Sequence, residues 1–356
     1  MTGEHPCQTD VDSAARSSPP RLKRPCPLVL AVLVNFNRRD LVLDAVHSLR
    51  QCDYPADRLE IIVVDNGSTD GSRQALAQQP GVRLILLDGN PGPAAARNAG
   101  IARARGEFLL LLDSDARLAP HGLRRTIELL AADPSITIAA LRILNGHTGE
   151  VDHWIYAQPH ASHGRRSFDT YSFSAAGAVI RACAARAVGG FWEPLFVYNE
   201  EVEFSIRVIG GGGRVVYLPS ATVLHYPSPR GRDSFGAYFR YQVRNWIWIF
   251  RRHYPARQRW SMIALYCGIY AVKGLANGTL RQCVRGMIDG LAGCPASAQS
   301  GTRLTGEQTR HLRTLNRRWI IRLRDIAATR GPRALVGGQA AASALDIAEA
   351  DAVALR

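Results

Sequence analysis

The chain has 356 residues, of which 46% are apolar and 21% charged, as expected for a globular protein of one large domain with an appendage or of two domains. Its seven scattered cysteines include no CxxC pair, which argues against a disulfide framework or zinc site and fits a reducing cytosol. The net charge of +14 is concentrated in residues 230–330, with 19 Lys and Arg against 4 Asp and Glu, and indicates an anionic partner: phospholipid, nucleic acid or a phosphorylated substrate.

Residues 1–25 are polar and rich in Pro and Ser, which predicts a disordered lead. No apolar stretch precedes Pro27, so no signal peptide is expected. The longest apolar candidate, Met262–Val272, is too short to span a bilayer and is followed by Lys273. These features favour a cytoplasmic protein.

The first third of the chain alternates continuous apolar runs with helical patterns. Strands are predicted at residues 27–34, 59–64, 82–87 and 107–112, and helices at 39–50, after 70 and at 94–104. This order predicts a mostly parallel α/β sheet with right-handed crossovers. Asn35, Asp65 and Asp113 follow three of these strands, so they should meet at the edge where such sheets bind ligands. No GxGxxG motif and no P-loop is present.

Two carboxylates, Asp113 and Asp115, end the apolar run Phe108–Leu112. Hard oxygen ligands at a strand end suit a Mg²⁺ or Mn²⁺ ion that also holds substrate phosphates. Asp and Ser are also ordinary turn residues, so the stretch alone fits a polar turn equally well.

After Pro120 the pattern becomes less regular. Strands are predicted at 136–144, 173–180 and 215–218 and helices at 181–188 and 201–209, while residues 145–169 have no assignment. Further on, aromatics and arginines interleave over 238–252, and one apolar helical face comprises Leu312, Leu315, Trp319, Leu323 and Ile326. The predicted organisation is a lead over 1–25, an α/β domain over 26–230, a basic helical region over 231–330 and a flexible tail over 331–356.

Six motifs occur in order between Pro27 and Arg252: VLVNFNR, VVDNGSTDGS, GNPGPAAARNAGI, LLLLDSDARL, GAVIRACAARAVGGFWEPLFVYNEEVEFSIR and VLHYPS. Each is weak alone, but their order and spacing resemble the inverting glycosyltransferases of family 2. The pair Arg244-Asn245 is similar to the rhamnosyltransferase-like branch. The resemblance implies the GT-A fold, a nucleotide-sugar-binding α/β fold with a mostly parallel central sheet, followed here by basic helices.

The resemblance implies a donor site at the sheet edge. Asn35 and Phe36 would border the base, and Asp65 could accept a hydrogen bond from a uracil or thymine ring N–H. Gly92 would let the backbone approach the diphosphate, and Arg97 would bring a cation to it. A capping Asp65, a plain loop at Phe36 and a solvated helix arginine at Arg97 are the alternatives.

The family pattern also implies a metal site. Asp115 would bind Mg²⁺ or Mn²⁺, Asp113 would contribute to the metal but face mainly the ribose, and His225 would be a third ligand. The metal would act as a Lewis acid on the leaving nucleoside diphosphate. A lone histidine is more often structural, so the assignment of His225 depends on the resemblance.

Inverting transfer needs one base to deprotonate the acceptor hydroxyl. The family carries it in a Glu-Asp pair that opens a helix, and here the pair is Glu200-Glu201. Glu201 takes the Asp position, so it is predicted to be the base, with Glu200 or Glu203 as alternatives because the extra methylene shifts the carboxylate. Acidic residues at a helix start also have a purely electrostatic explanation.

Three aromatic residues, Trp154, Trp192 and Tyr198, are candidates for stacking on sugar rings of the acceptor. Apolar rings shield the C–H faces of sugars well, but buried aromatics belong more often to the core.

The sequence therefore predicts a metal-dependent inverting glycosyltransferase at the cytoplasmic membrane face. The donor would be a dTDP- or UDP-sugar, with rhamnose a candidate, and the acceptor a lipid-linked saccharide or polysaccharide. The basic Trp/Arg helices suit an anionic membrane surface, or they pack only on the catalytic domain. A nucleic-acid-binding protein and a sugar nucleotidyltransferase are the alternatives; the first lacks a recognised module, and the second would normally have a Gly/Arg/Lys-rich loop after the first strand. The sequence does not indicate an oligomeric state.

Overall fold

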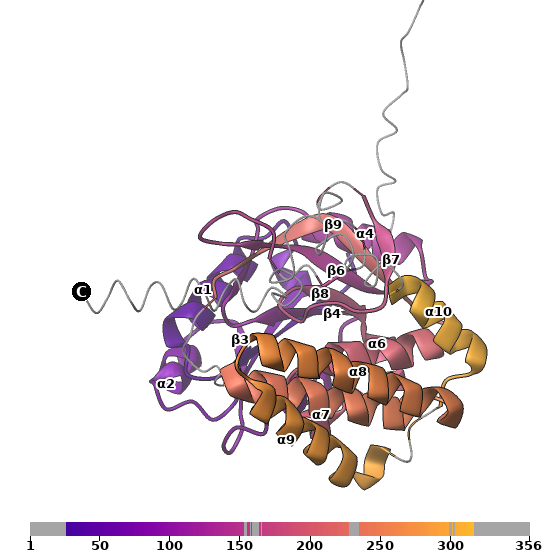
Figure 1. Cartoon of the computed structure of the whole chain (residues 1–356). Coiled ribbons are helices and arrows are strands. Elements are labelled where there is room, and N and C mark those ends of the chain that lie inside the picture. The colour runs from indigo at the N-terminus through magenta and orange to yellow at the C-terminus, as the bar shows by residue number, and fades with distance from the viewer. Residues whose placement is uncertain are drawn as a thin grey trace, which may run out of the picture.

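The structure is a computed structural model that describes residues 26–152, 155–156, 158, 164, 166–227, 235–298, 301 and 303–316. A single sheet runs through the described part of the chain, in the order β3-β2-β1-β4-β8-β6-β9-β5, with β7 paired to β9 (Figure 1). The predicted lead at 1–25, the tail at 331–356 and the helix positions Trp319, Leu323 and Ile326 lie outside the described residues.

The first half of the sheet is parallel, as predicted. Its strands are β1 (Val29–Asn35), β2 (Leu59–Asp65), β3 (Val82–Leu86) and β4 (Phe108–Asp113), connected by α1 (Arg39–Arg50), α2 (Ser72–Ala77) and α3 (Pro93–Ile101). Strand β1 is buried on both sides, because Leu30 and Val32 enter one core while Val29, Ala31 and Leu33 enter the other. This burial explains why the strand reads as an unbroken apolar run.

The second half of the sheet is mixed. Its strands are β5 (Ala116–Leu118), β6 (Ile136–Asn145), β7 (Phe168–Thr170), β8 (Ala178–Arg181) and β9 (Arg214–His225), and its helices are α4 (Leu123–Ala132), α5 (Ala182–Ala187) and α6 (Glu200–Gly210). Strand β8 is antiparallel to β4 and β6, whereas β6 and β9 are parallel.

Two predictions about these strands were wrong. Residues 173–177 form a turn closed by the Gly177 N–H on the Ser174 carbonyl at 3.1 Å, and Phe173 is apolar because it fills the core. Strand β9 continues past Leu218 to His225, because an irregularity in its register with β6 accommodates Pro219. This extension brings His225 to the end of a strand.

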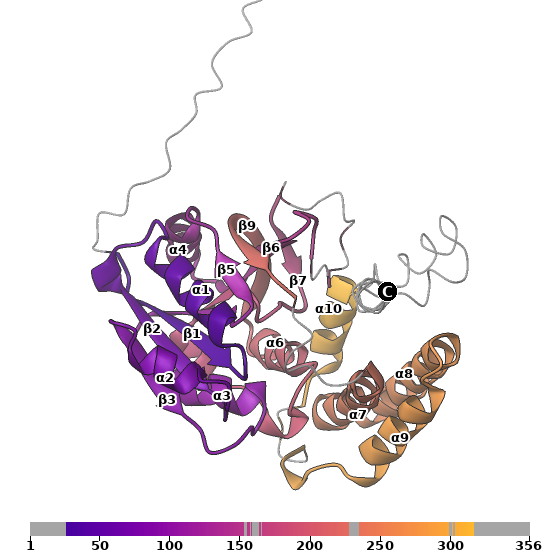
Figure 2. The same ribbon diagram turned by 90° about the vertical axis from the view of Figure 1, so that its left-hand side faces the viewer.

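Helices cover both faces of the sheet (Figure 2). Helices α1, α2 and α4 supply apolar residues to one core, and α3, α5 and α6 supply them to the other. The second core continues into the C-terminal helices through Val243, Ile247 and Phe250, so the sheet and these helices share one hydrophobic interior. The boundary at 230/231 remains a sequence prediction.

The C-terminal helices are α7 (Phe235–His253), α8 (Ala256–Ala276), α9 (Leu280–Ala292) and α10 (Gly306–Asn316). Helix α7 lies toward the sheet, and α8 and α9 pack on its outer side (Figure 2). Among the described helices, none is long and apolar enough to cross a membrane.

Candidate active site

The carboxyl ends of the parallel strands meet at one edge, as predicted. Asn35 pairs in register with Asp65, and Val34 pairs with Asp113, so the ends of β1, β2 and β4 are level. Phe36, the residue after β1, is partly exposed at this edge. The chain therefore presents the polar ends of three buried strands to one place.

Asp65 organises its own loop. It is fully buried, and it accepts hydrogen bonds from Asn35 Nδ2 at 3.1 Å, the Ser68 N–H at 2.9 Å and Arg73 Nε at 2.8 Å. Burial alone would raise the pKa of Asp65, but the bonds from Ser68, Arg73 and Asn35 outweigh it and lower the pKa. Asp65 therefore holds the turn after β2 but does not cap α2, whose N-cap is Gly71 without a side-chain hydrogen bond. Its bond to a nucleotide base stays a prediction.

Gly92 was assigned to the diphosphate, but its close neighbour is the chain itself. It has a φ of +97° at the start of α3, and an added Cβ would lie 2.6 Å from Cδ2 of Phe196. The glycine is needed because Phe196 of the loop before α6 packs directly against this turn. The donor-side loop and the loop that precedes the predicted base are therefore in contact.

Arg97 joins the two sides of the site. Its guanidinium is buried, and it donates from Nη1 to Glu200 Oε1 at 3.0 Å and from Nη2 to Asp113 Oδ1 at 3.1 Å. Burial would lower the pKa of Arg97, but Asp113, Glu200 and Glu201 raise it, so the side chain stays charged. The structure does not show the solvated helix arginine that was the alternative, nor a cation free of protein partners.

Asp115 and His225, two of the three residues predicted to bind a metal, lie close together. The distance from His225 Nε2 to Asp115 Oδ1 is 3.6 Å, and His225 Nδ1 lies 2.7 Å from Asp152 Oδ2. Burial lowers the pKa of His225, but Asp115 and Asp152 outweigh it and raise the pKa to about 9. The second oxygen of Asp115 accepts a 2.8 Å bond from Arg38 Nη1.

Asp115 and His225 are chemically suitable to bind a divalent metal, but they do not make up a complete coordination shell. A carboxylate on the remote ring nitrogen is the usual orienting partner of a ligating histidine. Within the described residues, no group of three or more His, Cys, Asp or Glu side chains is arranged around a metal position. Asp113 accepts a hydrogen bond from Arg97, so Asp115 and His225 are the two predicted metal-binding residues that the structure brings together.

Glu200 and Glu201, at the first turn of α6, have different surroundings. Glu200 is buried on Arg97, and its Oε2 has no hydrogen-bond partner. Glu201 is partly exposed and accepts a 3.4 Å bond from the Ala175 N–H. Burial and the adjacent Glu200 raise the pKa of Glu201 to about 8.

The loop before α6 has an unusual backbone that α7 holds in place. Phe196, Tyr198 and Asn199 have φ values of 63°, 69° and 63°, which are left-handed for residues with side chains. Buried Asn245 donates from Nδ2 to the carbonyls of Leu195, Val197 and Tyr198 at 3.1, 2.8 and 2.7 Å. Asn245, with Arg244 donating from Nη2 to the Leu195 carbonyl at 2.7 Å, therefore holds the segment that leads into Glu200 and Glu201.

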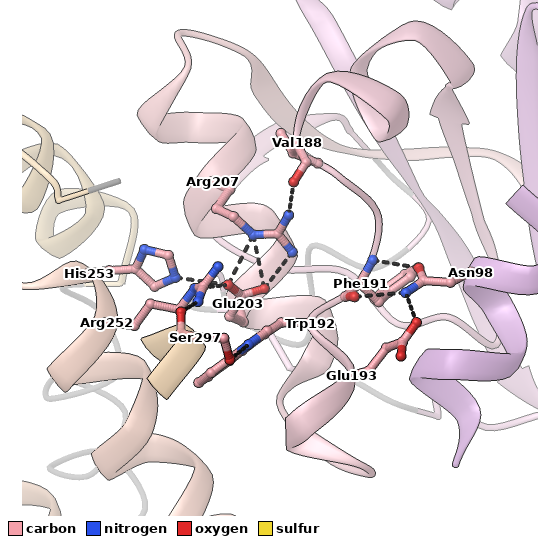
Figure 3. A network of polar contacts seen from close by, with 10 residues as sticks. All are labelled: Asn98, Val188, Phe191, Trp192, Glu193, Glu203, Arg207, Arg252, His253 and Ser297. Atoms are coloured by element: carbon pink, nitrogen blue, oxygen red, sulfur yellow. Dashed lines mark hydrogen bonds and ion pairs between the residues drawn. The ribbon is translucent and has the colours of Figure 1, made fainter. Parts of the chain in front are cut away.

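A second network joins α6 to α7 (Figure 3). Glu203 is fully buried and contacts Arg207 Nη2 at 2.5 Å, His253 Nε2 at 2.9 Å and Arg252 Nε at 3.2 Å. Burial alone would raise the pKa of Glu203, but His253 and Arg207 outweigh it and lower the pKa. Glu203, which the sequence left as an alternative base, is thus a buried carboxylate that binds residues of α7.

Trp192 and Tyr198, two of the residues predicted to stack on acceptor sugars, have different surroundings in the structure. Trp192 is buried with its ring below Arg252, at 4.5 Å from the guanidinium carbon, and its indole N–H donates to Ser297 Oγ at 3.1 Å (Figure 3). This is a core position rather than a sugar platform. Tyr198 lies in the loop just before Glu201, in ring contact with Tyr238 at 4.9 Å between centroids, and Trp154 lies outside the described residues.

Sequence reasoning missed several residues that build the site. Arg38, Asp152 and the Glu203–His253 pair carry no local pattern, since each partner lies far along the chain. Arg73 pairs with Asp65 only eight positions away, but no motif indicated that contact. The sequence did single out Asn245 as part of the Arg244-Asn245 pair, but no neighbouring residue indicated that its side chain binds the loop carbonyls.

Family models match most of this region. Residues 108–319 match the model described as Glycosyl transferase family group 2, and residues 31–182 match Glycosyl transferase family 2. Together these ranges contain every site residue described above.

Curated relatives act in sugar transfer and polysaccharide assembly. Over 131 residues, the chain is 37% identical to the succinoglycan biosynthesis protein ExoO of Rhizobium meliloti; the match covers 36% of this chain and 37% of ExoO, so the chain spans less than half of that relative. It is 26% identical over 246 residues to the N-acetylglucosaminyl-diphospho-decaprenol L-rhamnosyltransferase of Mycobacterium tuberculosis, a match that covers 57% of this chain and 80% of that enzyme.

A solved structure with a similar fold is the mannosyltransferase PcManGT of Pyrobaculum calidifontis, in complex with GDP-Man and Mn²⁺. The TM-score is 0.54 at 20% identity, and the alignment covers 88% of this chain and 89% of that one. This likeness supports the GT-A fold that the sequence predicted.

Proposed function

The chain belongs to glycosyltransferase family 2, and we propose that it transfers a sugar from a nucleoside-diphosphate sugar to an acceptor hydroxyl with inversion, using Glu201 as the base. The observation that carries this proposal is the unequal pair at the start of α6. Arg97 pairs Glu200, whereas Glu201 remains partly exposed with a pKa raised to about 8. A carboxylate of that basicity is well matched to proton abstraction near neutral pH.

The reaction would be a single displacement. Glu201 takes the proton of the acceptor hydroxyl as its oxygen bonds to the anomeric carbon, and the bond from that carbon to the diphosphate oxygen breaks on the opposite side. Glu200 and Arg97 hold the helix start in place, and the neighbouring negative charge of Glu200 keeps Glu201 basic.

Asp115 and His225 would hold a Mg²⁺ or Mn²⁺ ion at the donor diphosphate, with Asp152 orienting the imidazole. Such an ion supplies Lewis-acid stabilisation to the leaving group. Arg38 lies against Asp115 and places a permanent cation beside the same position. The Mn²⁺ in the PcManGT complex supports this assignment, although it belongs to that protein.

The donor and acceptor follow from the same edge and from the relatives. Asn35, Phe36 and Asp113 line the strand ends where the nucleoside would lie, with a dTDP- or UDP-sugar favoured and rhamnose a candidate sugar. The mycobacterial relative is named for a diphospho-decaprenol acceptor, which supports a lipid-linked saccharide acceptor here. We place the reaction at the cytoplasmic membrane face for that reason.

The test is release of nucleoside diphosphate from a panel of sugar nucleotides with Mn²⁺ or Mg²⁺. We expect Asp115→Ala to abolish nucleoside-diphosphate release, and removal of the metal by a chelator to have the same effect. Asp57→Ala, an exposed substitution at the other end of the sheet, should leave release unchanged. Release that is insensitive to both chelation and Asp115→Ala would refute the metal assignment. Salt-dependent nucleic-acid binding without sugar-nucleotide turnover would instead favour the nucleic-acid alternative.

A further inference from the structure

We propose that the outer face of the α8–α9 hairpin is the surface with which this chain lies on an anionic lipid bilayer, which would present a lipid-linked acceptor to the base. The proposal rests on the proposed function for the acceptor, but the lipid contact itself is argued from the helices alone.

Large apolar side chains are exposed on this hairpin far more than elsewhere. Of the nine exposed large hydrophobic residues in the described part of the chain, seven lie on α8 and α9: Trp260, Leu265, Val272, Leu275, Val284, Ile288 and Leu291. Leu275 is 66% exposed, Val272 62% and Ile288 59%. A concentration of this kind marks an interaction surface rather than the scattered apolar residues of an ordinary exterior.

These residues form one face. On α9, Val284, Ile288 and Leu291 follow one another at steps of four and three, which keeps them on one side of a helix. The opposite side packs on α7, since an added Cβ at Gly286 would lie 2.4 Å from the Arg240 carbonyl oxygen. Gly290 makes the same close approach to Ile247, with a Cβ distance of 2.8 Å. The apolar side of α9 therefore points away from the protein.

Helix α8 continues the same face. Its stretch from Ser261 to Val272 has no charged residue, although Ile263 and Tyr270 alone are buried there. A helix that is apolar on all sides is normally enclosed. Gly274 packs closely on Leu280 of α9, with an added Cβ 2.9 Å from its Cα, and both helices lie on the side of α7 away from the sheet (Figure 2).

The charged residues around this face indicate that its binding partner is an anionic lipid surface. Residues 256–292 contain five Arg and Lys against one acid, Asp289, and that carboxylate is already paired with Arg240 of α7 at 2.6 Å. Arg257, Arg281 and Arg285 are exposed beside the apolar residues. Two copies of this face would bring arginines together without acidic partners, whereas anionic headgroups complement them. Apolar residues with a cationic rim are the pattern of an interfacial helix.

The face is connected to the base through α7. Helix α7 carries the hairpin on one side, and on the other it holds the loop before α6 through Asn245 and the Tyr198–Tyr238 ring contact. A lipid carrier in the bilayer would thus lie beside the helix that fixes Glu201. The hairpin need not touch the reacting atoms.

The experiment is co-sedimentation of the full chain with phosphatidylcholine vesicles, with and without phosphatidylglycerol. We expect binding to vesicles that contain phosphatidylglycerol, and a decrease of about tenfold in the bound-to-free ratio for the double variant Val272→Glu/Ile288→Glu. Leu86→Glu on β3 is the matched control, because Leu86 is 54% exposed but lies in the sheet domain, and it should bind as the parent does. Arg281→Glu/Arg285→Glu should weaken binding and reduce its sensitivity to salt.

Several results would overturn the proposal. These are an absence of vesicle binding, equal binding by Val272→Glu/Ile288→Glu, a dimer that this double variant dissociates, or lipid binding that occurs only after removal of residues 317–356. Nucleoside-diphosphate release with a soluble acceptor separates this proposal from the proposed function. The hairpin variants should retain that release, and a fully active Glu201→Gln would refute the base while leaving sedimentation unaffected.

Discussion

The two sides of helix α6 place glutamates in opposite electrostatic environments. On the side that faces Arg97, this one guanidinium pairs with Glu200 and Asp113, and the pKa values of Glu200 and Glu201 are both raised. On the side that faces α7, here called the junction side, Glu203 has two arginines and a histidine around it, and its pKa is lowered.

The difference shows how residues of one type, within a single turn, are divided between chemistry and structure. A single cation beside Glu200 and Glu201 leaves a carboxylate, that of Glu201, which is costly to ionise and therefore has a raised pKa. An excess of cations on the junction side produces a permanently ionised group that fastens α6 to α7. The number of cations in contact with each carboxylate, rather than its burial alone, decides its role.

The strongest test of the comparison removes the base. Glu201→Gln keeps the shape of the side chain but cannot accept a proton, so transfer should fall by about 10²–10⁴-fold while the fold is retained. Initial rates of sugar transfer and thermal unfolding, measured together, check this. Glu200→Gln is the matched variant and should lose less activity; the reverse order would move the base to Glu200.

The second test breaks the junction side. Glu203→Gln leaves Arg207, Arg252 and His253 around an uncharged amide, and removing one partner of a buried ion network costs about 3–5 kcal/mol. Denaturant unfolding measures this loss. Glu60→Gln is the control, because its 3.8 Å pair with Arg83 is largely solvated and should contribute less than about 1 kcal/mol. Equal losses in the two variants would contradict the structural role of Glu203.

The third test concerns the loop between the two sides. Asn245→Ala removes the donor shared by three loop carbonyls and should cost about 1–3 kcal/mol of stability, with a lower kcat and an unchanged KM for the donor sugar nucleotide. Asn245→Asp should be worse than alanine, since its carboxylate would face those same oxygens. Asn277→Ala, which loses one bond at the end of α8, is the control. If alanine and aspartate behaved alike, Asn245 would not hold the loop.

The sequence predicted those parts of the site that depend on local pattern. Apolar runs placed Asn35, Asp65 and Asp113 at one edge because parallel strands end together. Glu200 and Glu201 were singled out by the resemblance to the acidic pair of the family. The order of six motifs predicted the GT-A fold, which a periodicity argument alone would not have reached.

The contacts of the site could not be predicted, because each depends on residues brought together by folding. Arg97 and Glu200 are 103 positions apart, and Arg38 and Asp115 are 77 apart. The neighbours of Trp192 and Gly92 could not be predicted for the same reason, since Ser297 and Phe196 come from distant segments. Whether a glutamate is basic or fixed depends on these neighbours, so Glu203 could not be separated from Glu201 by sequence alone.

The gentlest test leaves the chain unchanged and varies pH. With the pKa of Glu201 raised to about 8, the acid form predominates at pH 7, so transfer should rise about tenfold from pH 7 to pH 9 and then level off. The rise follows from the sign of the shift, because only the deprotonated form accepts the hydroxyl proton.

The same shift in the pKa of Glu201 predicts that the parent chain loses stability relative to Glu201→Gln as pH rises from the ordinary glutamate pKa, about 4.5, through about 8. Glu203 predicts the opposite dependence, since a lowered pKa contributes stability that is lost as pH falls below that ordinary value. Unfolding measured from below about pH 4.5 to above about pH 8 would therefore show two opposed slopes, the upper one reduced in Glu201→Gln, where Glu200 still contributes, and the lower one reduced in Glu203→Gln, where Asp65 still contributes. A single slope common to all three chains would mean that the two sides of α6 do not differ in charge as the structure indicates.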